Sequence, residues 1–154
     1  MVFFKGMLNK TKTWGQGMDV MVSAITPRYR DLFKGMLDSD RNRADAAYDA
    51  ILFDRKLAAP ALIEQYKKAN KNEMMRYLCV QLMGFSDSRK VINPLMDALD
   101  DPSAMVRREA CFALEDLVAH EAIDTIKQRI QDVDPNVRQI AKEVYDLLNR
   151  VNPK

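Results

Sequence analysis

The chain has 154 residues, of which 47% are hydrophobic and 30% are charged, so it can form one compact domain or one short repeat array. Its formal net charge of +2 is close to neutral and gives no overall field that would attract nucleic acid or an anionic membrane. The basic side chains gather in the first 30 residues, and the remainder is slightly acidic.

Cysteine usage and the N-terminal stretch indicate the compartment. Cys79 and Cys111 lie in apolar helical patterns without CxxC spacing, which is typical of buried thiols in a reducing environment. The first residues lack the continuous apolar segment and cleavage site of a secretory signal, and no run of 18 apolar residues occurs. We therefore expect a cytoplasmic protein without a membrane span.

The N-terminal third contains an internal echo. The segment Phe4–Asn9 has the sequence FKGMLN, and Phe33–Asp38 has FKGMLD. This similarity predicts a degenerate repeat over residues 2–25, although Gly15 and Gly17 disfavour its second helix and a leader segment is the alternative. Residues 28–53 follow as a further helix pair.

The second half repeats with a period of 31 residues. Asn70, Asp101 and Asp132 share this spacing, and so do Val106-Arg107 and Val137-Arg138. Each unit has two helical apolar patterns around a turn rich in Asp, Asn and Pro. A period of about 20 to 50 residues indicates stacked supersecondary units. The sequence therefore predicts an all-α, α-α superhelix of four to five repeats in one domain over 1–154, with units at 2–25, 28–53, 58–85, 88–118 and 121–148.

The motif DPxxxVRxxA, present at 101–110 and with two residues fewer between Pro and Val at 134–141, resembles a HEAT repeat, and more specifically the short HEAT-like type of phycobilisome lyases. The resemblance implies a helix-pair solenoid. It implies little about function, because one scaffold can serve many tasks.

The repeated polar positions have a structural interpretation. We expect Asp101 and Asp132 to cap the second helices, and the arginines to pair with aspartates of adjacent repeats. These residues form a predicted structural ladder, which we prefer to an anion-binding row: Arg76, Asp101, Arg107, Asp132 and Arg138.

Catalytic chemistry has no clear signature. His120-Glu121 is the one His-Glu pair and resembles those of deoxyhypusine hydroxylase, but it lies between repeats and a single histidine cannot build a multi-histidine iron site. The cysteines have no nearby histidine motif, and no glycine-rich phosphate-binding loop occurs. We expect no catalytic residue, no metal and no cofactor.

Function is therefore expected on positions that share the period but differ in residue type. The stripe beside the core positions of the second helices contains aromatic and charged side chains suited to an interface. We predict a non-catalytic scaffold, monomeric or weakly self-associating, that binds a partner protein on a concave face through Tyr77, Gln81, Arg108, Phe112, Glu115, Gln139 and Glu143. A bilin lyase or tetrapyrrole chaperone is the alternative, and nucleic-acid binding through the basic N-terminus ranks last.

Overall fold

A computed structural model describes residues 23–151, and every regular element in that range is a helix. The predicted all-α helix-pair solenoid is therefore confirmed. The helices are α1 (Pro27–Gly35), α2 (Arg41–Phe53), α3 (Arg55–Lys68), α4 (Glu73–Gly84), α5 (Ile92–Ala98), α6 (Ala104–Asp116), α7 (Ile123–Arg129) and α8 (Pro135–Val151), with single 3₁₀ turns η1 (Arg89–Val91) and η2 (His120–Ala122). The predicted repeat at 2–25 lies almost entirely outside the described residues.

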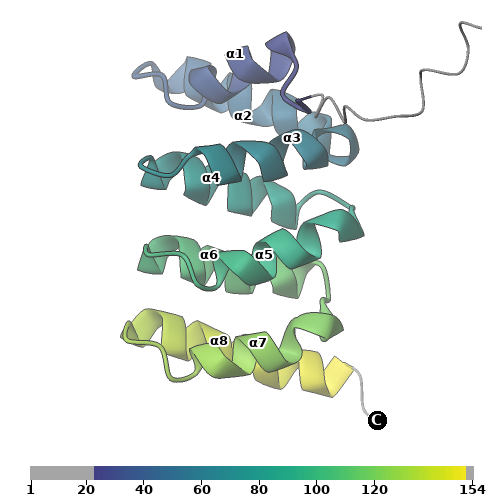
Figure 1. Cartoon of the computed structure of the whole chain (residues 1–154), viewed down its shortest axis with the longest axis vertical. Helices are drawn as coiled ribbons and strands as arrows, with labels where there is room; N and C mark the ends of the chain where they lie inside the picture. The colour runs from purple at the N-terminus through teal and green to yellow at the C-terminus, as the bar shows by residue number, and fades with distance from the viewer. Residues whose placement is uncertain (1–22, 152–154) are drawn as a thin grey trace, which may run out of the picture.

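The helices stack as four antiparallel pairs, α1/α2, α3/α4, α5/α6 and α7/α8 (Figure 1). The second helices α4, α6 and α8 pack side by side in one layer, and the first helices form the other layer. One pair cannot cover its own apolar face, so each pair buries it against its neighbours.

Each second helix begins at a side-chain cap. The side chains of Asp40, Asn72, Ser103 and Asp134 accept backbone N–H groups of the first turns of α2, α4, α6 and α8. The prediction that Asp101 and Asp132 would cap these helices is wrong. They lie two residues before the cap and accept the N–H of the cap residue itself, at 2.9 and 3.0 Å.

The core runs continuously through the stack and consists largely of Leu, Ile, Val, Met and Ala. Both cysteines are buried in it, and burial raises the pKa of the Cys111 thiol to about 12. Small residues let the second helices approach closely. A Cβ added at Gly84, the last residue of α4, would lie 2.9 Å from Ala113 of α6.

Candidate protein-binding face

The residues predicted to bind a partner all lie on the second-helix layer. Tyr77 and Gln81 come from α4, Arg108, Phe112 and Glu115 from α6, and Gln139 and Glu143 from α8. All are at least partly exposed, and we call these seven residues the α4–α6–α8 stripe. Gly84, which extends the same helical spacing in α4, does not belong to it, because it is buried against Ala113.

At the α4 end of the stripe, three polar side chains form a hydrogen-bonded chain. The Tyr48 hydroxyl of α2 donates to Gln81 Oε1 at 2.9 Å, and Gln81 Nε2 donates to the Tyr77 hydroxyl at 3.1 Å. Burial, reinforced by the nearby Glu109 carboxylate, raises the pKa of Tyr48 to about 12. These hydrogen bonds hold the rings of Tyr48 and Tyr77 in fixed positions across α2 and α4.

Glu109 of α6 lies beside this chain and is partly buried. Burial raises the pKa of Glu109, although Gln81, Arg108 and Tyr77 around its carboxyl counteract the rise. The neighbouring Arg108 has its Nε atom buried without a hydrogen-bond partner among residues 23–151. A buried donor without a partner costs free energy.

The centre and the α8 end of the stripe combine an aromatic ring with acidic groups. Phe112 keeps 36% of its surface exposed, although it lies among buried neighbours on α6. Burial, Asp116 and Glu143 of α8 all raise the pKa of Glu115. These three carboxylates form an acidic cluster, and Glu115 follows Phe112 by three residues on α6. Gln139 Nε2 donates to Glu143 at 3.0 Å.

Tyr48 and Glu109 belong to this face but were not among the predicted residues. The sequence prediction omitted Tyr48 because it included only residues of α4, α6 and α8, whereas α2 also contributes to this face. Glu109 follows the Val-Arg-Arg triplet and has the same charge as many solvated side chains, so the sequence offers no signal of its partial burial.

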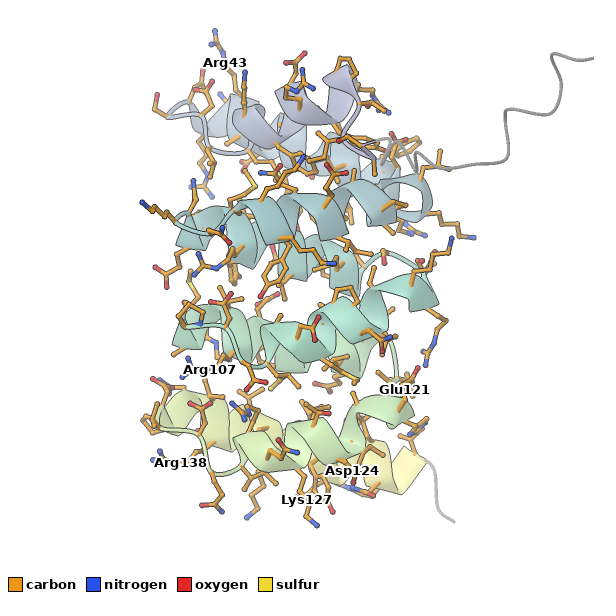
Figure 2. The ribbon with its side chains drawn as sticks, in the orientation of Figure 1. Arg43, Arg107, Glu121, Asp124, Lys127 and Arg138 are labelled. Atoms are coloured by element: carbon orange, nitrogen blue, oxygen red, sulfur yellow. The ribbon has the colours of Figure 1, made fainter. Side chains whose placement is uncertain are left out.

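The predicted structural ladder occupies a different edge of the molecule, beside the turns within the pairs. Figure 2 shows Arg107 and Arg138 on that edge and Glu121 on the opposite one. Arg76 donates to Asp101 at 2.8 and 3.1 Å, and Arg107 donates to Asp132 at 2.9 and 2.7 Å. Both pairs are buried and bidentate, the geometry in which Arg binds carboxylate best.

Each ladder arginine also closes its own turn. The Nη1 atoms of Arg76, Arg107 and Arg138 donate to the carbonyl oxygens of Asn70, Asp101 and Asp132 at 2.8 to 2.9 Å. Arg138 stands at the end of the row and is exposed, and among the described residues no carboxylate pairs with it. The ladder therefore links pairs two, three and four.

Groups that could support catalysis are dispersed. His120 begins η2 between the third and fourth pairs, and burial raises the pKa of both cysteines. Within residues 23–151, no group of three or more His, Cys, Asp and Glu side chains is arranged to hold a metal ion. In the same range, no helix has the length and apolar character needed to cross a membrane.

The family model for HEAT repeats matches residues 59–145, which is more than half of the chain. The chain belongs to the HEAT-repeat family. No curated protein is similar enough to count as a match. The family assignment covers α3 to α8 almost completely, so it includes the stripe and the whole ladder. HEAT repeats are in general scaffolds for protein interactions.

Proposed function

We propose that this protein is a non-catalytic scaffold that binds a partner protein on the α4–α6–α8 stripe. The observation that carries the proposal is the exposed Phe112 ring, which shares the stripe with the hydrogen-bonded Tyr77 and Gln81 and with the acidic Glu115 and Glu143. Interfaces concentrate their binding free energy in aromatic and arginine side chains surrounded by polar groups that exclude water.

The composition of the stripe defines the partner surface that would fit it. A partner contributes an apolar pocket for Phe112 and a hydrogen-bond acceptor for the Arg108 guanidinium, since Arg108 is partly exposed. Basic side chains of the partner face Glu115 and Glu143, whose mutual repulsion they relieve.

A photo-crosslinking amino acid at position 112 tests the surface directly. The control places the same amino acid at Phe53, which is 90% exposed at the end of α2 and lies outside the stripe. In extracts of the native cell, we expect one protein crosslinked from position 112 and not from position 53. Equal products from both positions, or none, would refute the proposed face.

The captured partner then permits a measurement of affinity. We expect Phe112→Ser to weaken binding by roughly thirtyfold, as for an aromatic hot spot, and Phe53→Ser to leave it unchanged. Circular dichroism should show the same helicity for both variants. The bilin lyase or chaperone alternative predicts a new absorbance band when the protein is mixed with a bilin and an acceptor protein, and such a band would replace the proposal.

A further inference from the structure

A groove of about 520 Å³ lies between the first two helix pairs, on the side of the first helices. Side chains of α1, Leu37 in the α1–α2 turn, the end of α3, the α3–α4 turn and Met75 of α4 line it. We call it the basic groove, because Arg30, Lys34, Lys68 and Lys71 surround it and none of its lining residues carries a carboxylate.

The groove lies at the first interface, where no ladder pair joins the described residues of the two helix pairs. The ladder arginines stand four residues after the helix cap, and the aspartates that receive them stand two residues before the next cap. At the first interface these two positions hold Ala44 and Asn70. The corresponding grooves at the second and third interfaces contain the ladder pairs and measure only about 270 and 360 Å³.

The floor of the groove is apolar. Phe33 and Met75 are buried beneath it, while Leu37 at its rim keeps 40% of its surface exposed. An apolar side chain placed here would cover Leu37 and remove its surface from water, which is favourable. The groove can therefore hold more than a simple ion.

The basic side chains around the floor are largely free to meet a ligand. Arg30, Lys34 and Lys71 are exposed and make no ion pair with any described residue, whereas Lys68 bonds to Glu64 at 2.5 Å. Lys34 and Lys68 lie in the last turns of α1 and α3, where a cation stabilises the helix dipole. Arg30 and Lys71 occupy no such position, so helix stability does not account for the whole group.

We propose that the basic groove binds a short acidic segment of a partner protein that carries one large apolar side chain. The apolar side chain rests on Phe33, Leu37 and Met75, and the flanking carboxylates pair with Arg30, Lys34 and Lys71. Complementary charge identifies the ligand class, since the lining offers cations on an apolar base and no acid. The site is distinct from the α4–α6–α8 stripe and does not depend on it.

Fluorescence anisotropy tests the proposal on the full chain. The probe is a labelled short peptide of glutamate and aspartate with one central phenylalanine. Matched peptides replace the phenylalanine by alanine, or the acidic residues by lysine. We expect binding of the phenylalanine peptide that weakens as salt rises, weaker binding of the alanine peptide, and none of the lysine peptide.

Two charge-reversal variants locate the site. We expect Lys34→Glu combined with Lys71→Glu to lower the affinity for the phenylalanine peptide by about tenfold, which is the effect expected from reversing two exposed charges. The control, Lys127→Glu with Lys142→Glu, changes the same net charge on the last helix pair and should change affinity less than twofold. Leu37→Ser should remove the preference for phenylalanine over alanine. Thermal melting checks that all variants fold.

Four results would overturn the proposal. These are no binding of the phenylalanine peptide, equal weakening by the groove and control variants, equal affinity for the phenylalanine and alanine peptides, and displacement of the peptide by inorganic phosphate or a single-stranded oligonucleotide at comparable concentration. The last would show a general anion site. Conservative variants, Lys34→Gln with Lys71→Gln, provide the same test if charge reversal impairs folding.

Discussion

The second and third interfaces of the stack carry a buried Arg–Asp pair, and the first interface does not. Arg76–Asp101 and Arg107–Asp132 bridge the later pairs of helices with bidentate hydrogen bonds. At the first interface the equivalent positions are Ala44 and Asn70. The basic groove belongs to this same interface.

The difference shows that the apolar core, and not the ion pairs, holds the pairs of helices together. The core runs from Ile25 to Leu148 through all three interfaces, with or without a ladder pair. The free energy that a buried ion pair loses through dehydration is about as large as the free energy that it gains from mutual attraction. Its net contribution to stability is therefore small. The ladder instead fixes how one pair is placed on the next.

The largest loss of stability is expected when a buried arginine is removed from the middle of the ladder. Arg107→Ala leaves the buried Asp132 carboxylate with the N–H of Asp134 and, as its nearest cation, Arg129 at 3.9 Å. We expect the free energy of unfolding to fall by about 3 to 5 kcal/mol. Arg138→Ala, at the exposed end of the row, should cost less than about 1 kcal/mol. Urea unfolding measures both, and equal losses would contradict a ladder that ends at Arg138.

The Arg107–Asp132 pair should make the stability of the protein depend on pH. Burial alone would raise the pKa of Asp132, but hydrogen bonds from Arg107 and from the N–H of Asp134 outweigh it, so the pKa lies below its usual value of 3.8. The stabilisation is therefore complete above that value and is lost as the pH falls through the lowered pKa. Thermal melts should show a steeper acid loss for the wild type than for Asp132→Asn. Parallel curves would exclude a contribution of this carboxylate.

The smallest effect is expected when the ladder is transferred to the first interface. Ala44→Arg alone places an unpaired charge at a half-buried position and should destabilise the protein. Adding Asn70→Asp should restore stability to within about 1 kcal/mol of the wild type. A double-mutant cycle gives the coupling, and coupling near zero would show that the two interfaces differ in more than these two residues.

The fold could be predicted from the sequence because its signals are local and repeated. The 31-residue spacing, the helical apolar patterns and the turns at Asn70, Asp101 and Asp132 each require only neighbouring residues to be read. The capping error had a local origin too. Asp101 and Asp132 are residue types that often cap helices. Ser103 and Asp134, two positions later, are also good cap residues, and they occupy the cap positions of α6 and α8.

The surface residues were harder to predict because the exposure of a side chain depends on which neighbouring helix packs against it. Gly84 follows the helical spacing of the stripe, yet α6 approaches so closely that a Cβ would meet Ala113. Glu109 looks like an ordinary charged residue, but its position beside Tyr77 and Gln81 partly buries it. The basic groove needs residues about 40 positions apart, such as Arg30 and Lys71.

The sequence by itself determined that this chain is a stack of helix pairs with Arg and Asp at fixed places in each repeat. Periodic apolar residues and turn chemistry suffice for that, because they act within one repeat. The tertiary structure decided which of these charges are buried, where the row of pairs stops and which surfaces stay open. Those properties arise from the packing of one pair on the next, and the basic groove exists only once α1, α3 and α4 are in place.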